Sequence, residues 1–241
     1  MNTTHAMLVI GAMCLAEACY PVPAGSSAAP VSGGASSGAK SCPDGMVDDC
    51  EDGDHKVSET AGRGGYWYTY ADKAGTTITP PTGESGGTFA MSDGGDGASK
   101  KAAHMNGTVG KGNVVFGGMG FGFADPKGQY DASKYKGVRF KAKIGEASTQ
   151  LVRLKVPDSN TDPDGQKCKE CFNDFGADLT LTTSWQTYTI MFSSMRQQSG
   201  WGSPHPASID AAHLYGMQWQ ANTPGAKFDV WVDDVELVGC E

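Results

Sequence analysis

Apolar and polar residues alternate in short runs along most of the chain after residue 42. In one such run Val138, Phe140 and Ala142 alternate with Arg139 and Lys141, as expected for a strand with one buried face. The pattern predicts about ten strands separated by Gly, Pro, Asp and Asn. They cover residues 45–52, 66–70, 88–92, 102–108, 114–123, 138–143, 151–156, 178–181, 186–192, 215–220 and 228–238. So many strands with so few helical stretches predict an all-β sandwich or barrel.

One predicted strand is rich in glycine. Residues 117–123 read Gly-Gly-Met-Gly-Phe-Gly-Phe. A glycine-rich loop that binds phosphate needs a following helix and a lysine, and this tract has neither. Glycine that alternates with Met and Phe indicates a strand whose glycines face a tightly packed neighbour or a bound ligand.

The N-terminal part of the chain has a different composition. Residues 1–19 contain an apolar run of signal-peptide length, and residues 20–41 are mostly Ser, Gly, Ala, Pro and Val, as in a flexible linker. This order resembles a bacterial lipoprotein signal, which implies a lipid on Cys19. Glu17 departs from that pattern, and a plain secretory signal is the alternative. We expect an exported bacterial protein, tethered to the cell surface or secreted, whose β-sandwich domain spans residues 42–241.

Charge and hydropathy limit the classes of partner. The net charge is −8, and the Lys and Arg residues are scattered. Nucleic-acid binding usually leaves a basic stripe, so no nucleic-acid partner is expected. No segment after the signal approaches the roughly 20 apolar residues of a transmembrane helix, so membrane contact is expected only through a lipid anchor. We expect the protein to act as a monomer.

The cysteines predict two disulfides. Cys168 and Cys171 lie in a loop with no second pair that would complete a zinc site, so a small loop-stiffening disulfide is favoured. Cys42 precedes the first strand of the domain and Cys240 follows the last, so they meet if those strands are antiparallel neighbours. Cys50 alternates with acidic residues and is expected in the core as a free thiol.

Four segments together resemble one family of β-sandwiches. The domain opens with Met-Val-Asp-Asp-Cys-Glu-Asp-Gly-Asp at 46–54 and continues with Gly-Arg-Gly-Gly-Tyr-Trp-Tyr at 62–68. Ser-Trp-Gln-Thr-Tyr stands at 184–188, and Phe-Asp-Val-Trp-Val-Asp-Asp-Val-Glu-Leu closes the domain at 228–237. This bracket resembles galactose-binding-like jelly rolls, notably carbohydrate-binding modules and the complex I intermediate-associated protein family. The resemblance covers residues 44–237 and implies a two-sheet jelly roll. Cys50 stands where the family pattern has Phe.

Acidic residues at both ends of this bracket suggest a cation site. Asp49 and Glu51 are two residues apart, so they project from one face if they share a strand. Asp233 and Asp234 lie in an otherwise apolar strand, where bare carboxylates are costly to desolvate. If the first and last strands are adjacent, the carboxylates converge, and Ca²⁺ tolerates such irregular oxygen sites. The related modules commonly hold a structural calcium there. We therefore expect Ca²⁺ on Asp49, Glu51 and Asp233; solvated edge carboxylates are the alternative.

Sugar binding requires aromatic faces and planar polar groups. Tyr66, Trp67 and Tyr68 form a dense aromatic run, of which at least one member points away from the core. Trp201 lies between glycines, where a core role is less natural. Polar candidates beside these aromatics are Arg153, Gln197 and Gln218. Core packing is the alternative for each aromatic, and it is favoured for Trp185, Trp219 and Trp231.

Catalytic signatures are missing from the sequence. The acidic pairs that would suit a glycosidase are the ones assigned to calcium, the five histidines lack metal-binding spacing, and no GxSxG motif is present. We expect non-catalytic binding of a polysaccharide or oligosaccharide. The alternatives are a jelly-roll polysaccharide lyase or glycoside hydrolase, and a protein-binding scaffold. A cluster of Tyr68, His104 and Arg153 would favour the lyase.

Overall fold

The computed structural model describes residues 29–33, 38–83 and 89–240. The predicted signal at 1–19, Cys19 and most of the predicted linker lie outside these residues. Two strands begin inside the predicted linker, namely β1 (Val31–Ser32) and β2 (Ser41–Asp48). None of the helices in the described part of the chain is long and apolar enough to cross a membrane.

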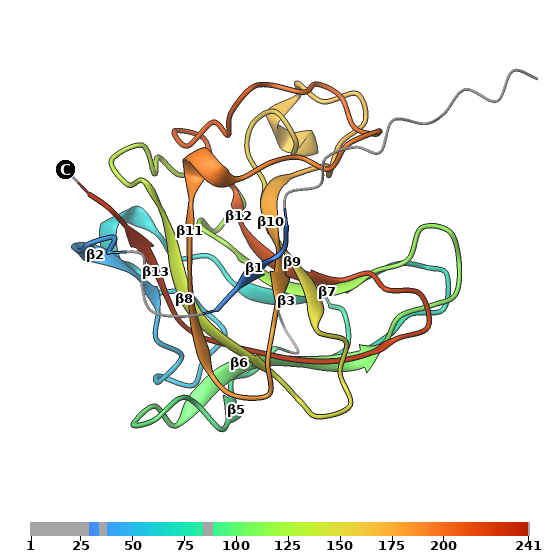
Figure 1. Cartoon of the computed structure of the whole chain (residues 1–241). Helices are drawn as coiled ribbons and strands as arrows, with labels where there is room; N and C mark the ends of the chain where they lie inside the picture. The colour runs from blue at the N-terminus through green and yellow to red at the C-terminus, as the bar shows by residue number, and fades with distance from the viewer. Residues whose placement is uncertain (1–28, 34–37, 84–88, 241) are drawn as a thin grey trace, which may run out of the picture.

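Within the described residues the chain forms two β-sheets (Figure 1). The first sheet has six strands in the order β1-β10-β9-β12-β7-β3. Besides β1, its strands are β3 (Trp67–Ala71), β7 (Gly117–Gly122), β9 (Leu151–Val156), β10 (Phe175–Thr180) and β12 (Gly216–Ala221). All neighbours are antiparallel except β1 and β10, which pair parallel.

The second sheet has seven strands, with the path β11-β8-β13-β6-β4, to which β2 adds on β13 and β5 on β6. Besides β2, its strands are β4 (Thr77–Thr79), β5 (Ser92–Asp93), β6 (Lys101–Thr108), β8 (Gly137–Ile144), β11 (Gln186–Met191) and β13 (Lys227–Val238). Three short 3₁₀ turns, η1 (Thr60–Gly62), η3 (Pro163–Gly165) and η4 (Phe192–Ser194), interrupt the described strands. The all-β sandwich prediction is confirmed.

The core lies between the inner faces of the two sheets. Trp67 of β3 and Trp219 of β12 are both fully buried and stack with ring centroids 5.8 Å apart. Phe140 of β8 meets Trp219 edge-on from the other sheet, at 5.2 Å. Such aromatic pairs stabilise beyond the area they bury. Trp185 and Trp231 are only partly buried, so the core prediction was wrong for them. Trp231 alternates with the buried Val230 and Val232 of β13, and Trp185 directly precedes β11.

Both predicted disulfides are present, and Cys50 is a buried free thiol. Because β2 and β13 are antiparallel neighbours, Cys42 and Cys240 meet with their Cα atoms 5.7 Å apart. Cys50 does not lie in a strand, however. Strand β2 ends at Asp48, and Cys50 has a positive φ of 61°.

Two long connections lie together at one end of the sandwich (Figure 1). One joins β9 to β10 and carries the Cys168–Cys171 disulfide, and the other runs from η4 to β12. Backbone hydrogen bonds join them, because Ser203 N donates to Glu170 O at 3.1 Å and Lys169 N donates to Ser203 O at 2.9 Å. These connections form one wall of the site described next.

Candidate functional groove

The outer face of the first sheet carries polar side chains in register across neighbouring strands. One row runs Tyr68–Gly120–Gln218–Lys155 across β3, β7, β12 and β9. Gln218 Nε2 donates to the hydroxyl of Tyr68 at 2.9 Å. These side chains share a face because residues directly opposite each other on neighbouring strands point to the same side of a sheet. The row places an aromatic ring, an amide and a cation side by side.

A second row lies two residues along the strands. It runs Tyr70–Gly118–Gln220–Arg153. The Tyr70 hydroxyl is 3.4 Å from Gln220 Oε1, to which it donates a hydrogen bond. The two rows repeat the same order of chemistry, which suits a ligand with a repeating unit.

The glycines of β7 allow this face to be hollow. A Cβ atom on Gly118 would overlap the ring of Tyr70, and one on Gly120 would lie 2.8 Å from Gln218 Cγ. Tyr70 and Gln218 therefore lie flat over the strand, as the sequence pattern predicted for tightly packed neighbours.

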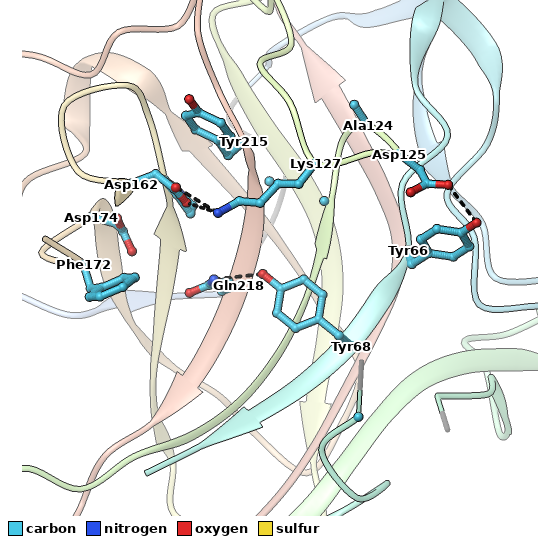
Figure 2. Close-up of a pocket in the computed structure, with 14 residues that line it drawn as sticks. Tyr66, Tyr68, Ala124, Asp125, Lys127, Asp162, Phe172, Asp174, Tyr215 and Gln218 are labelled. Atoms are coloured by element: carbon cyan, nitrogen blue, oxygen red, sulfur yellow. Dashed lines mark hydrogen bonds and ion pairs between the residues drawn. The ribbon is translucent and has the colours of Figure 1, made fainter. Parts of the chain in front are cut away.

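Two pockets lie along this face and share Tyr68, Phe172, Asp174 and Gln218. Their volumes are about 450 and 720 Å³, each within the usual range for a small-molecule site. Because they share lining residues, we treat them as one elongated groove. Figure 2 shows the smaller pocket, with Asp162, Asp174 and Phe172 on one side and Tyr66 and Asp125 on the other.

Exposed apolar side chains gather on this groove. Five large hydrophobic residues are exposed in the described part of the chain, and three of them line the larger pocket. These three are Val114, Phe172 and Trp201, with 75%, 58% and 43% of their surface exposed. Large apolar groups that are exposed together indicate a contact surface for a partner or ligand.

The wall formed by the two long connections carries the exposed aromatic residues Phe172 and Trp201. Asn173 is buried, and its Nδ2 donates to the carbonyl oxygens of Gln198 and Trp201 at 2.8 and 2.6 Å. Gln198 N donates back to Asn173 Oδ1 at 2.9 Å. Phe172 has a φ of 74°, an uncommon conformation for a residue with a side chain. These hydrogen bonds hold the backbone that carries the two exposed rings, which lowers the entropy lost on binding.

The charges of the groove are paired. Lys127 contacts Asp162 at 2.8 Å and Asp164 at 3.0 Å. Arg153 contacts Asp178 at 2.9 Å. Lys155 contacts Asp174 at 3.0 Å. Arg153 and Lys155 are both nearly buried, so their ion pairs are screened less than surface pairs.

Tyrosine hydroxyls complete the polar lining. Burial raises the pKa of Tyr68 and raises that of Tyr70 strongly, so both phenols stay protonated at neutral pH. The hydroxyl of Tyr66 donates to Asp125 Oδ2 at 2.9 Å, and this hydrogen bond to a carboxylate raises the pKa of Tyr66. Protonated phenols can donate to or accept from sugar hydroxyls.

The groove contains most of the binding residues expected from the sequence. Tyr66, Tyr68, Arg153, Trp201 and Gln218 all line it.

Two expected residues do not line it. Trp67 is fully buried because it alternates with its outward neighbours, and its Nε1 donates to Asp48 Oδ2 at 2.6 Å. Gln197 turns away, since its Nε2 donates to the carbonyl oxygens of Asn173 and Pro204. Gln198 lines the groove in its place.

Several groove residues escaped the sequence analysis, notably Lys155, Phe172 and Asp174. Lys155 alternates with Leu154 and so shares a face with Arg153, a signal that was available. Phe172 and Asp174 lie in a loop with no periodic pattern, so only the tertiary structure reveals them.

The three expected calcium ligands do not form a metal-binding cluster within the described residues. Asp49 and Glu51 are exposed after the end of β2, whereas Asp233 is buried in β13. Glu51 Oε1 accepts hydrogen bonds from Lys100 N and Lys101 N, both at 2.8 Å. No group of three or more His, Cys, Asp or Glu that could hold a metal occurs in residues 29–33, 38–83 and 89–240.

The buried carboxylate of Asp233 accepts hydrogen bonds from backbone N–H groups. Asp233 accepts from Asp96 N at 3.0 Å and from Asp234 N at 2.8 Å. These backbone donors offset part of the desolvation cost that suggested a cation, although burial still raises the pKa of Asp233. As arranged here, the three predicted ligands do not fit a calcium site, and the ion stays a prediction from the sequence.

The cluster that would favour a lyase is not assembled. Tyr68 and Arg153 line the groove on the first sheet, but His104 lies on β6 of the second sheet. His104 stacks on Trp231 with centroids 3.7 Å apart and hydrogen bonds to Asp229.

Solved structures of similar fold include carbohydrate-binding modules. The family 11 module of the cellulosomal cellulase Lic26A-Cel5E of Clostridium thermocellum matches with a TM-score of 0.54 and 17% identity, over 81% of this chain and 94% of that one. A family 11 module from the same organism, solved in complex with a β-1,3-1,4-mixed-linked tetrasaccharide, gives the same TM-score and identity over 81% and 95%. A family 30 module matches with a TM-score of 0.50 and 12% identity, over 78% and 96%.

The chain shares the two-sheet β-sandwich fold of these modules. At these identities the likeness shows the fold alone, and it agrees with the jelly-roll resemblance drawn from the sequence. No protein-family model and no curated protein matches the chain.

Proposed function

We propose that the groove binds a polysaccharide or oligosaccharide without cleaving it. The observation that carries this proposal is the grouping of Phe172, Trp201 and Val114 beside rows of hydroxyl, amide and cationic groups. Sugar rings have apolar faces that pack on aromatic rings and hydroxyl edges that hydrogen bond to planar polar groups. The groove offers both kinds of contact along its length.

The extent of the groove favours a chain of sugar units over a single sugar. Two contiguous pockets, each large enough for a small ligand, share Tyr68 and Gln218 at their junction. The two in-register rows of side chains could each contact a successive unit. The tetrasaccharide bound by a structural neighbour supports the same class of ligand.

Truncation of the exposed aromatics tests the proposal. Trp201→Ala should weaken binding about fivefold, since loss of one stacking contact costs about 1 kcal/mol and 1.4 kcal/mol is a factor of ten. Phe172→Ala should act in the same direction. Binding is measured by affinity gel electrophoresis against immobilised polysaccharides and by calorimetry with soluble oligosaccharides.

Met46→Ala is the matched control. Met46 is also a large exposed apolar residue, at 39%, but it lies on β2 of the second sheet. If Met46→Ala weakens binding as much as Trp201→Ala, the groove is not the site. If Trp201→Ala unfolds the domain, the ring is structural. Shortening of any polysaccharide by the purified protein would replace binding with catalysis.

The cellular setting is part of the proposal. We infer export by residues 1–19 and surface tethering through Cys19 and the linker at 20–41. Two disulfides in the folded domain support an oxidising compartment outside the cytosol. Cys19→Ser should release the protein from the membrane fraction; unchanged fractionation would leave the plain secretory signal as the better reading.

A further inference from the structure

Asp174 lines both pockets. Figure 2 shows it beside Asp162 and Phe172 at the smaller pocket. Asp174 directly precedes β10, and only 2% of its surface is exposed. One carboxylate oxygen, Oδ2, is 3.0 Å from Lys155 Nζ. The other, Oδ1, is buried and has no hydrogen-bond partner among the residues that the structure describes.

The other carboxylates of the groove have donors. Asp162 accepts from Lys127 at both oxygens, at 2.8 Å each, and Asp125 accepts from the hydroxyl of Tyr66. A buried acceptor without a donor costs free energy, so such atoms are rare in folded proteins and call for an explanation. Asp174 Oδ1 is therefore a buried, unpaired acceptor on a residue that lines both pockets.

The charges that line the groove indicate whether the bound sugar is acidic or neutral. Three cations (Lys127, Arg153 and Lys155) and three carboxylates (Asp125, Asp162 and Asp174) line the two pockets. Each of the three cations already contacts a carboxylate. An acidic sugar would have to break one of these pairs and would also meet the charge of Asp174. A neutral sugar avoids both costs and brings hydroxyl donors.

We propose that Asp174 determines specificity by accepting a hydrogen bond from a sugar hydroxyl at Oδ1, and that the ligand is a neutral, hydroxyl-rich polysaccharide. This inference rests on the proposed binding function and names its ligand class. The ion pair with Lys155 orients the carboxylate, so the sugar hydroxyl donates to a charged acceptor. Hydrogen bonds to charged acceptors are stronger than those between neutral groups.

The test compares wild type with Asp174→Asn on a neutral β-glucan, a neutral β-galactan and polygalacturonate. The amide has nearly the same shape but loses the charge, and with its oxygen toward Lys155 it presents N–H to the junction. Binding to the neutral polysaccharide should weaken at least about tenfold, because a hydrogen bond to a charged group is worth more than the 1.4 kcal/mol of a tenfold change.

Asp233→Asn is the control. Asp233 is equally buried but lies in the second sheet, and both of its oxygens accept backbone N–H groups. The Asp233→Asn substitution should lower the melting temperature without changing the affinity for polysaccharide. If Asp174→Asn does not fold, Asp174→Glu serves instead, because it keeps the charge for Lys155 but moves the oxygens, and it too should weaken binding.

The possible outcomes distinguish failure of the proposed role of Asp174 and of the neutral ligand class from failure of polysaccharide binding itself. Equal affinities of wild type and a folded Asp174 variant would overturn the role of Asp174. Preference of wild type for polygalacturonate would overturn the neutral class. If wild type binds none of the polysaccharides, the proposed function itself fails.

Discussion

Asp48 gives the protein a pH-dependent stability that can be calculated from its surroundings. It ends β2 with only 3% of its surface exposed. Its carboxylate accepts hydrogen bonds from Cys50 N at 2.7 Å and from Trp67 Nε1 at 2.6 Å. Burial raises the pKa of Asp48 from 3.8 to about 7, against the two hydrogen bonds, which lower it.

The sign of the effect follows from proton binding. The folded protein holds the proton of Asp48 more tightly than the unfolded chain, so protonation favours the folded state. The contribution to the free energy of unfolding is fully present below about pH 4 and is lost as the pH rises to about 7. A shift of about three pKa units corresponds to about 4 kcal/mol, at about 1.4 kcal/mol per unit.

Asp48→Asn removes this titration. The amide keeps one acceptor but turns an N–H group toward one of the two donors, which costs about 1–3 kcal/mol. At pH 4.5 the variant should be less stable than wild type by about that amount. At pH 8 it should equal or exceed wild type, because it escapes the loss of about 4 kcal/mol. The two stability curves therefore cross between these values.

Urea unfolding from pH 4.5 to 8, followed by tryptophan fluorescence, measures the difference. Burial raises the pKa of Asp158 and Asp233 and lowers that of His104, so these groups also change stability in this range. They titrate in both proteins, and the difference between the curves isolates Asp48. A constant difference across the range would show that Asp48 is ionised throughout, and the reasoning would be refuted.

Two further predictions concern the groove and the metal. Gly118→Ala should weaken polysaccharide binding, because the added methyl group would push the Tyr70 ring into the larger pocket. Gly122→Ala should leave the fold unchanged, because its Cβ meets no atom closer than 3.5 Å. Calorimetric melting and affinity electrophoresis of both variants check this, and equal binding by Gly118→Ala would contradict it. EDTA should leave the melting temperature nearly unchanged, because both carboxylate oxygens of Asp233 accept hydrogen bonds from backbone N–H groups. A clear fall in the melting temperature, with calcium found by elemental analysis, would support the predicted calcium site instead.

The sequence alone determined the architecture and the covalent links. Alternation between Val138, Phe140 and Ala142 and their polar neighbours reports directly on which face of a strand is buried, because that pattern has the period of the strand itself. The positions of Cys42 and Cys240 at the two ends of the domain were enough to predict their disulfide, once the flanking strands were taken as neighbours.

The sequence was less reliable where a strand ends. Asp49 and Glu51 were placed on one strand face, but β2 stops at Asp48 and the positive φ of Cys50 redirects the chain. The buried carboxylate of that region is Asp48, which the sequence did not single out. A strand end depends on which residues find pairing partners, and alternation does not report on that.

The wall of the groove was decided by tertiary structure. Alternation placed Arg153 and Gln218 on the polar faces of their strands, but it could not choose which of Tyr66, Trp67 and Tyr68 turns inward. Phe172 and Asp174 come from a loop without a period. They reach the groove because Asn173 joins their loop to that of Trp201, a contact between residues 28 positions apart. Hydrogen bonds between distant loops leave no local pattern in a sequence, so the site becomes visible only when the chain is folded.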